Sequence, residues 1–280
     1  MAQTVSQIAA IHQQPPIALT IAGSDSSGGA GIQADLKTFM AFQVHGCSAV
    51  SCVTAQNSCG VERVDALSPD ALKAQVETVR SDLPVAALKS GMLLNADLIE
   101  ATAEVLKDWS VPRVIDPVMV SRSGAILLES DAIEALRRQL LPLADVLTPN
   151  LHEAALLSGE SLSDPSAMEN AARRIQAMGP AVVLIKGGGE ARWQGQDLLL
   201  DGDQLQWLPG PRVDTPHSHG TGCTLSAAIT ALMAQQVSVT EAIGTGRAYV
   251  KAALQQSLAI GSGQGPVCHW INAGGGQIDK

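Results

Sequence analysis

Two glycines separated by one threonine and followed by a cysteine form the sharpest chemical motif in the sequence. The motif is Gly220, Thr221, Gly222 and Cys223, and a largely apolar stretch typical of a buried helix follows it. Glycines let the backbone turn so that successive N–H groups point at one spot, and the start of a helix adds about half a positive charge there. The segment therefore predicts a site for an anion, such as the oxygens of a phosphoryl group.

Cys223 falls in the first turn of this predicted helix. At such a position the pKa of a thiol is expected to fall and the thiolate to become accessible, so that it could act as a general base toward a substrate hydroxyl. A small buried thiol that packs at the start of the helix is the competing interpretation, and the cysteine alone favours it. A catalytic role for Cys223 therefore needs support from the residues around it.

Polar residues and glycines follow six short apolar segments that are typical of buried strands. The chain alternates between such segments and helical patterns, which predicts a mainly parallel sheet with helices on both faces. In open α/β sheets, ligands bind beyond the carboxyl ends of the strands. We therefore expect one site at this edge, formed by Gly23 and Asp25, Thr54 to Asn57, Lys89 to Met92, Asp116 and Pro117, Thr148 to Asn150, and Lys186 to Gly188.

The elements that position these residues follow from the same alternation. The expected strands are 17–22, 48–53, 85–88, 113–115, 145–147 and 181–185, with two more in 192–208 that join at a hairpin turn over 201–203. The expected helices are one after the loop 23–31, with Ile32, Leu36, Phe39 and Met40 on one face, and then 69–81, 96–107, 131–139, 151–157, 167–178, 221–234 and 240–258. We expect a flexible leader over 1–16, a single domain over 17–269 and a loose tail over 270–280, with the glycine-rich chain already loose after Gly261.

Several residues at the predicted edge have structural explanations that compete with a functional role. Asn150, with Glu153 three residues later, resembles a capping box. Asp116 precedes a proline, so it could hold a magnesium-bound water or form a turn. Lys186 could meet a phosphate or be a solvated lysine. The glycine-rich loop 28–31 could cradle a ligand or simply turn the chain, and it has neither the lysine of a Walker A loop nor the GxGxxG spacing of a dinucleotide site.

The composition of the chain limits the classes of partner that it is expected to bind. The net charge of −9 argues against a nucleic-acid groove, which needs clustered lysines and arginines. Five scattered cysteines without a CxxC pair argue against a disulfide framework or a structural zinc site, and they favour a reducing cytoplasm. The sequence shows no signal-peptide pattern and no apolar run of the ~18 residues that a membrane helix needs. We therefore expect a cytoplasmic protein that acts on a small molecule, without a nucleic-acid or membrane partner.

Taken together, the motifs resemble the hydroxymethylpyrimidine/phosphomethylpyrimidine kinases of thiamine biosynthesis, within the ribokinase-like superfamily. The residues that carry the resemblance run in family order from about 17 to 269, as Ala22 to Phe39, Thr54 to Asn57, Lys89 to Leu93, Asp116 to Val120, Thr148 to Leu151, Lys186 to Gly188 and His219 to Thr224. The resemblance implies an αβα sandwich with a small β flap, ATP and Mg²⁺, and a homodimer. It also implies two successive phosphorylations of 4-amino-5-hydroxymethyl-2-methylpyrimidine, first at the alcohol and then at the monophosphate.

The resemblance further implies roles for single residues. Cys223 corresponds to the catalytic base, beside the phosphoryl-binding segment Gly220, Thr221 and Gly222. Gln56 corresponds to an amide that reads the pyrimidine, which suits the donor and acceptor groups of a glutamine. The further residues expected at the substrate are Met92, which would pack on the ring, and Gly23, Asp25 and Asp35. The residues expected at the nucleotide are Lys186, Asn150, Thr221 and Gly222, and those expected at Mg²⁺ are Asp116 and Glu153.

The chain departs from the family pattern at three positions: His152 in place of a proline, Ser218 in place of a threonine, and Gly189 in place of a histidine. Three other functions stay open. A pyridoxal kinase of the same superfamily also phosphorylates a hydroxymethyl heteroaromatic ring. A non-catalytic protein would bind nucleotide or pyrimidine without releasing ADP, and a Cys–His hydrolase would use Cys223 with His219 and need no ATP.

Overall fold

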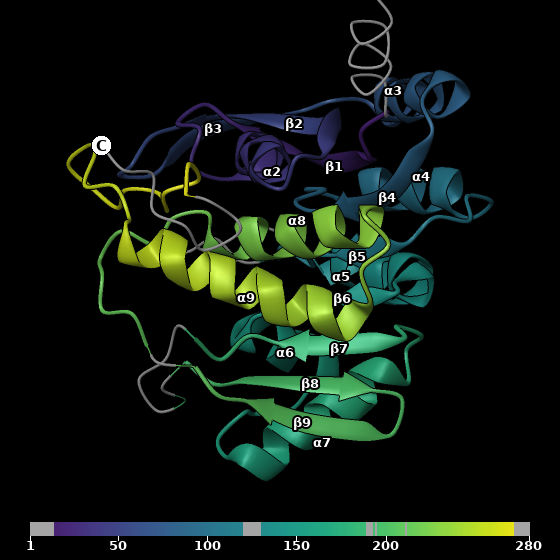
Figure 1. The fold of residues 1–280 in the computed structure, drawn as a ribbon. Coiled ribbons are helices and arrows are strands. Elements are labelled where there is room, and N and C mark those ends of the chain that lie inside the picture. The colour runs from purple at the N-terminus through teal and green to yellow at the C-terminus, as the bar shows by residue number, and fades with distance from the viewer. Residues whose placement is uncertain (1–13, 120–129, 189–192, 194, 211, 272–280) are drawn as a thin grey trace, which may run out of the picture.

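The computed structural model describes residues 14–119, 130–188, 193, 195–210 and 212–271 (Figure 1). Its centre is a nine-stranded sheet in the order β3-β2-β1-β4-β5-β6-β7-β8-β9. The strands from β2 to β7 in this order pair in parallel, whereas β3, β8 and β9 pair antiparallel at the two sides. The strands are β1 Ile17–Asp25, β2 His45–Gln56, β3 Val61–Ala66, β4 Val85–Ser90, β5 Arg113–Ile115, β6 Val146–Leu147, β7 Val182–Ile185, β8 Asp197–Asp201 and β9 Gln204–Leu208.

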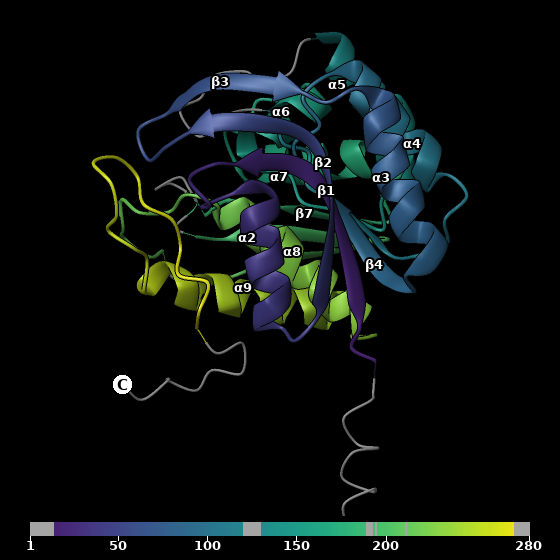
Figure 2. The same cartoon turned by 90° about the horizontal axis from the view of Figure 1, so that it is seen from above.

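Helices cover both faces of the sheet, which confirms the predicted three-layer αβα sandwich (Figure 2). One face carries α2 (Gly31–Ala41), α8 (Thr221–Ala234) and α9 (Val239–Gln255). The other face carries α3 (Pro69–Asp82), α4 (Ala96–Leu106), α5 (Ser130–Ala135), α6 (Leu151–Ser158) and α7 (Pro165–Gln176). A π-helical segment, Leu136–Leu140, and a 3-10 turn, Leu141–Leu143, continue α5.

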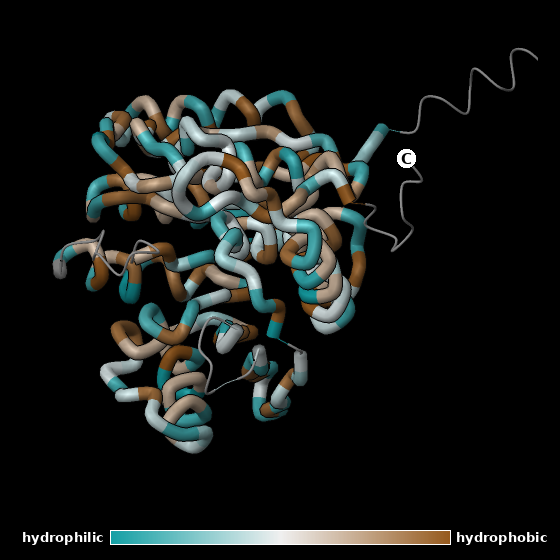
Figure 3. The backbone as a smooth tube through the Cα atoms, turned by 90° about the vertical axis from the view of Figure 1, so that its left-hand side faces the viewer, coloured by the Kyte–Doolittle hydropathy of each residue, from teal (hydrophilic) through white to brown (hydrophobic). Residues whose placement is uncertain are grey.

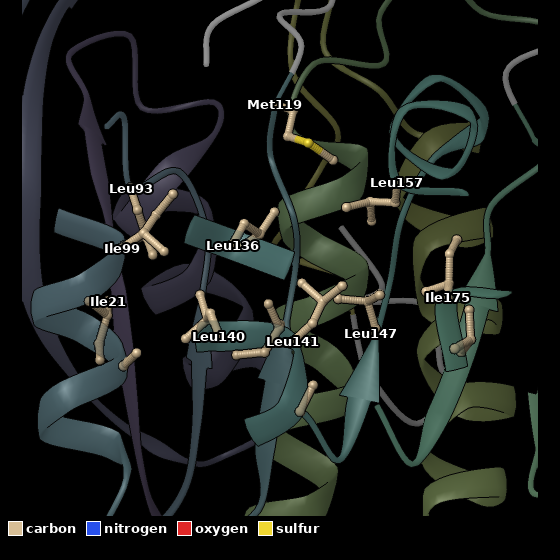
Figure 4. Packing of buried hydrophobic residues seen from close by; sticks show 14 of the residues in the cluster. Ile21, Leu93, Ile99, Met119, Leu136, Leu140, Leu141, Leu147, Leu157 and Ile175 are labelled. Atoms are coloured by element: carbon tan, nitrogen blue, oxygen red, sulfur yellow. The ribbon is translucent and has the colours of Figure 1, made fainter. Parts of the chain in front are cut away.

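The two faces of the sheet have separate hydrophobic cores. Because side chains alternate along a strand, Leu19 and Ile21 of β1 enter the core under α3 to α7, whereas Ala18 enters the core under α2, α8 and α9. Figure 4 shows Ile21, Leu93 and Ile99 within the first of these cores. Along the helical coils, hydrophobic and hydrophilic residues alternate, as expected for helices buried on one side (Figure 3). Over the described residues, no helix combines the length and the apolar character that a membrane span requires.

Most predicted elements are confirmed, and three expectations are wrong. Helix α8 has the predicted bounds, and β8 and β9 form the predicted hairpin, although residues 192 and 194 of that segment lie outside the described ranges. Strand β3 was not expected, because all its residues are exposed and its pattern carries no burial signal. Met40 was placed on the buried face of its helix but is 81% exposed.

The third wrong expectation concerns the chain after Gly261. Val267, Cys268 and Ile271 are buried there, against α8 and α9, so the segment belongs to the core. Glycine-rich composition suggested a loose tail, but the consecutive residues Val267, Cys268 and His269 are buried and include no glycine, whereas Trp270 is exposed. Residues 1–13 of the expected leader and 272–280 of the expected tail lie outside the described residues.

Candidate active site

Helix α8 starts against the glycine-rich loop that precedes α2. Gly220 has a φ of +79°, in the left-handed region that favours glycine. A Cβ atom at Gly220 would lie 1.8 Å from the carbonyl oxygen of Gly29, so only a glycine fits there. The first-turn N–H groups of α8 have no partners within the helix and point outward with the positive end of its dipole. The local geometry therefore agrees with the predicted anion site.

Cys223 lies between the starts of two helices. The backbone N–H of Gly31, the first residue of α2, donates a hydrogen bond to Cys223, while Cys223 itself is in the first turn of α8. The expectation of a lowered thiol pKa is nevertheless wrong for the protein without ligands. Burial raises the pKa of Cys223 from its ordinary value of 9.0 to about 11, and the nearby ammonium of Lys89 only partly opposes this.

A buried ion pair lies beneath this cysteine. Lys89, at the end of β4, and Asp35, in α2, are both 0% exposed, and Lys89 Nζ lies 2.6 Å from Asp35 Oδ1. The hydroxyl of Thr20 donates to the other oxygen of Asp35 at 2.6 Å. Burial alone would lower the pKa of Lys89, but Asp35, Cys223 and Asp116 outweigh it and hold that pKa above its usual range. Since both oxygens of Asp35 are occupied, a direct contact between Asp35 and a substrate stays a prediction.

Asp116, which follows β5, and Lys186, which follows β7, form a second ion pair. Lys186 Nζ lies 2.9 Å from Asp116 Oδ1, and the hydroxyls of Thr148 and Ser226 donate to the same carboxylate. Burial would raise the pKa of Asp116, but Lys186 and Lys89 outweigh it and hold that pKa below its ordinary value. A Cβ atom at Gly222 would lie 3.3 Å from Lys186 Nζ. The absence of a side chain at Gly222 thus leaves the ammonium and the α8 amides close together.

Asn150 and Glu153 form the capping box that their spacing predicts. Asn150 Oδ1 accepts from the N–H of Glu153 at 2.9 Å, and Glu153 Oε2 accepts from the N–H of Asn150 at 2.8 Å. The main chain of Lys186 bonds to that of Pro149, which brings Asn150 beside Lys186. Glu153 is 2% exposed, and burial raises its pKa to about 7 although Lys186 opposes the shift.

The acidic residues at this edge suit a magnesium ion that is completed by phosphate. Mg²⁺ in kinases is commonly held by one or two carboxylates together with substrate phosphates and water. Among the described residues, no group of three or more histidine, cysteine or acidic side chains could hold a metal ion alone. Asp116 and Glu153 both lie near Lys186, and Glu153 is a buried carboxylate with a raised pKa, which a nearby cation would relieve. The residues therefore fit the ion, and a metal role for Asp116 and Glu153 stays a prediction.

Asp25 organises the glycine-rich loop instead of standing free. Its carboxylate accepts from the backbone N–H groups of Ser27, Gly29 and Ala30, and from the Ser27 hydroxyl. His219 Nε2 lies 2.8 Å from Asp25 Oδ2. Burial would raise the pKa of Asp25, but these hydrogen bonds outweigh it and lower that pKa to about 2. Asp25 is 4% exposed, so the structure shows a scaffold role, and its contact with a substrate stays a prediction.

The remaining substrate residues form two adjacent contacts. The Gln56 amide nitrogen lies 3.3 Å from His219 Nε2, and Gln56 Oε1 accepts from Thr54. Because the Asp25 carboxylate accepts, His219 Nε2 donates to it and cannot also accept from the Gln56 amide nitrogen, which can therefore donate to a ligand. A Cβ atom at Gly23 would lie 2.8 Å from the terminal methyl of Met92, so these two predicted residues touch.

The structure also shows supporting residues that sequence reasoning missed. Gly187, next to Lys186, donates its N–H to Asp197 Oδ1 at 2.9 Å, and Arg247 of α9 donates to Asp197 Oδ2 at 2.7 Å. His269 Nε2 lies 3.0 Å from the hydroxyl of Thr224. These partners are 10 to 50 residues apart in the chain, and no local pattern signals them. His219, in contrast, stood next to the predicted anion segment, which was a usable signal.

The chain is similar to known proteins over most of its length. The model of the family described as phosphomethylpyrimidine kinase matches residues 25–268. A hydroxymethylpyrimidine/phosphomethylpyrimidine kinase of Synechococcus elongatus is 54% identical over 256 residues, which cover 91% of this chain and 97% of that protein. A pyridoxine kinase of Bacillus subtilis is 43% identical over 257 residues, which cover 90% of this chain and 95% of that protein.

A solved structure shares the fold at nearly full length. The pyridoxal kinase of Staphylococcus aureus, in complex with AMP-PCP and pyridoxal, superposes with a TM-score of 0.85 at 35% identity and covers 94% of this chain and 95% of its own. The match of the family model and the 54% identity over most of both chains are sufficient to assign the family. The chain therefore belongs to the phosphomethylpyrimidine kinase family.

Proposed function

We propose that this protein uses ATP to phosphorylate 4-amino-5-hydroxymethyl-2-methylpyrimidine and then its monophosphate, as a step toward thiamine diphosphate. The family match and the names of the curated relatives support the reaction. The observation that carries the proposal is the start of α8, where the first-turn amides, the Lys186–Asp116 pair and the Cys223 thiol come together. The complex of the related pyridoxal kinase with AMP-PCP supports ATP as the donor.

Cys223 would accept the proton of the hydroxymethyl group while the α8 amides and Lys186 receive the phosphoryl oxygens. Phosphoryl transfer needs positioning and charge stabilisation more than covalent chemistry, which suits this arrangement. A thiol with a pKa of about 11 is scarcely ionised at neutral pH. The thiolate-dependent rate should therefore rise about tenfold per pH unit from pH 7 to 9.

Mg²⁺ would supply positive charge to the phosphates when bound, with Asp116 and Glu153 as its protein ligands. Lys186 would contact the transferring group directly, since its side chain is 16% exposed and its ammonium lies beside Gly222. Asn150 would lie at the nucleotide beside Lys186. On the substrate side, Gln56 would read the aminopyrimidine edge, and Met92 would pack on the ring above Gly23.

ADP release by the purified protein with Mg²⁺-ATP and the aminopyrimidine alcohol tests the proposal. Replacing Cys223 by alanine should lower turnover by ~100-fold or more, which is the range of lost general-base catalysis. Near-normal turnover of Cys223→Ala would reject the base but not the kinase. No ADP release from the unaltered protein, with ligand binding retained, would favour a non-catalytic binding protein.

Pyridoxal phosphorylation is the second candidate, because a pyridoxine kinase is 43% identical over most of both chains. Turnover measured side by side on pyridoxal and on the aminopyrimidine decides between them. A Cys–His hydrolase has no support, since the Nε2 atom of His219 contacts Asp25 and Gln56.

We further propose a homodimer and a cytoplasmic location. Val53 of β2 and Val61 and Val64 of β3 are exposed hydrophobic residues at one side of the sheet, which supports contact with a second copy of the chain. All five cysteines are unpaired, which suits a reducing compartment. Light scattering coupled to gel filtration would give the mass in solution, and a monomer at micromolar concentration would reject the dimer.

A further inference from the structure

The chain after α9 returns to the active site and forms main-chain hydrogen bonds with His219, which directly precedes the anion segment 220–223. We name residues 258–269 the C-terminal strap. The backbone of His219 is bonded on both sides by this strap, since its N–H donates to Gly265 and its carbonyl accepts from Val267. The strap is anchored in turn by a hydrogen bond from the Cys268 N–H to the carbonyl of Ala253 in α9. In Figures 1 and 2 it is the yellow segment that follows α9.

His269, at the end of the strap, reaches the first turn of α8 through one hydroxyl. Its Nε2 lies 3.0 Å from Thr224 Oγ1, and that hydroxyl donates to the carbonyl of Gly220 at 2.8 Å. Because the only proton of the hydroxyl goes to Gly220, Thr224 accepts from His269 Nε2–H. Thr224 is 0% exposed and His269 is 5% exposed, so water does not replace either partner.

The imidazole of His269 is suited to donate one hydrogen bond at all pH values near neutrality. Burial, together with the positive charge of Lys37, lowers the pKa of His269 to about 4. The ring is therefore neutral at physiological pH and carries a single N–H, which goes to Thr224. The carbonyl of His269 accepts from the hydroxyl of Tyr249 in α9 at 2.8 Å, which holds its backbone.

The anion segment is also in close contact with the glycine-rich loop that precedes α2. Gly220 packs against Gly29 so closely that a Cβ atom would collide. We propose that His269 is a positioning residue for phosphoryl transfer, which acts through Thr224 to hold the Gly220 peptide and hence the direction of the α8 amides. The inference rests on the proposed kinase function of these amides. It adds a residue that was not among the predicted ligand-binding residues and whose side chain contacts Thr224.

The effect should fall on turnover more than on binding. The α8 amides stabilise charge that shifts during transfer, and a misplacement of about 1 Å can cost as much as 100-fold in rate. We expect His269→Phe and Thr224→Val each to lower kcat by about 10- to 100-fold, with KM for both substrates within about threefold of normal. Thr224→Ser keeps the hydroxyl and should stay within about twofold of normal kcat.

Two features separate positioning from general loss of packing. Val267→Ala is the matched control, because it removes buried apolar atoms from the strap and leaves the hydrogen-bond chain intact. Its kcat per folded protein should be normal even if its melting temperature falls. The double variant Thr224→Val/His269→Phe should be no slower than the slower single variant, since both break one chain of bonds.

Hydrogen–deuterium exchange gives a readout that does not need turnover. The peptide covering residues 220–226 should exchange faster in His269→Phe than in Val267→Ala. The proposal fails if His269→Phe keeps normal kcat per folded protein, if the two losses multiply in the double variant, or if exchange in this peptide matches the control. If the unaltered protein shows no kinase activity, the proposed function fails, and the exchange comparison still decides the positioning role.

Discussion

The ionisation of Cys223 can be shifted in opposite directions by two substitutions in one buried pair. Lys89→Met removes the positive charge of the Lys89–Asp35 pair, and Asp35→Asn removes its negative charge. A buried negative charge opposes ionisation of a nearby thiol, whereas a positive charge favours it. The pKa of Cys223 should therefore rise in Lys89→Met and fall in Asp35→Asn.

The size of the shift follows from the starting value. The pKa of Cys223 is raised from 9.0 to about 11, chiefly by burial, which amounts to about 3 kcal/mol against the thiolate. One unit charge several ångströms away contributes on the order of 2 kcal/mol at an effective dielectric constant near 20. We therefore expect each substitution to move the pKa by roughly 1.5 units, upward without Lys89 and downward without Asp35.

Alkylation by iodoacetamide measures this directly, because only the thiolate reacts. The rate at the Cys223 peptide would be followed by mass spectrometry from pH 7 to 11 in a Cys59→Ser background, since Cys59 is exposed. In the parent protein the rate should still rise about tenfold per pH unit up to pH 10, beyond the plateau of an ordinary thiol. Thr20→Val, which removes a hydrogen bond to Asp35 but no charge, should leave this profile nearly unchanged.

Two results would refute the reasoning. A plateau near pH 9 in the parent protein would mean that burial does not raise the pKa of Cys223. Shifts in the same direction for Lys89→Met and Asp35→Asn would mean that loosened packing, and not the charge of the pair, governs the thiol.

Three further substitutions test the surroundings of the anion segment. Gly222→Ala places a methyl group 3.3 Å from Lys186 Nζ and should raise KM for ATP several-fold in steady-state assays while the melting temperature stays normal. Arg247→Met removes the charged partner of Asp197, whose carboxylate also accepts from the Gly187 N–H next to Lys186. Because Lys186 is expected at the nucleotide, this variant should raise KM for ATP at least threefold. An equal rise in KM for the pyrimidine would contradict a role at the nucleotide. Gly220→Ala combines a positive φ with a collision and should cost about 2–4 kcal/mol in urea unfolding, whereas parent-like stability would contradict the packing described.

The features that sequence reasoning predicted well depend on residues close together in the chain, or on the rule that the carboxyl ends of parallel strands lie at one edge of the sheet. The Asn150–Glu153 box spans three residues, so its spacing alone predicts both hydrogen bonds, and the structure contains them. Helix α8 starts directly after Gly220 and stays largely apolar to its end, which defines its bounds. The parallel sheet then places Asp116 at the end of β5 and Lys186 at the end of β7, on either side of β6, although 70 residues separate them.

The features that it missed depend on what surrounds a residue in space. The first turn of α8 was recognised, but the pKa of Cys223 depends on its burial and on the charges of Asp35 in α2 and Lys89 in β4, which its local sequence does not show. Asp35 was read as a substrate ligand without its partner Lys89, 54 residues away. His269 had no visible partner because Thr224 lies 45 residues earlier, and the exposed strand β3 has no hydrophobic alternation to reveal it.

The C-terminal strap also sets the order in which a growing chain can complete its active site. All strands of the sheet and the anion segment itself are synthesised before residue 258, yet the carbonyl of His219 and the hydroxyl of Thr224 have no strap partners until Val267 and His269 have been added. A nascent chain can therefore form most of its core while the phosphoryl-binding turn still lacks its support. Catalytic competence should be the last property that the chain acquires during synthesis, and the first that a shortened C-terminus removes.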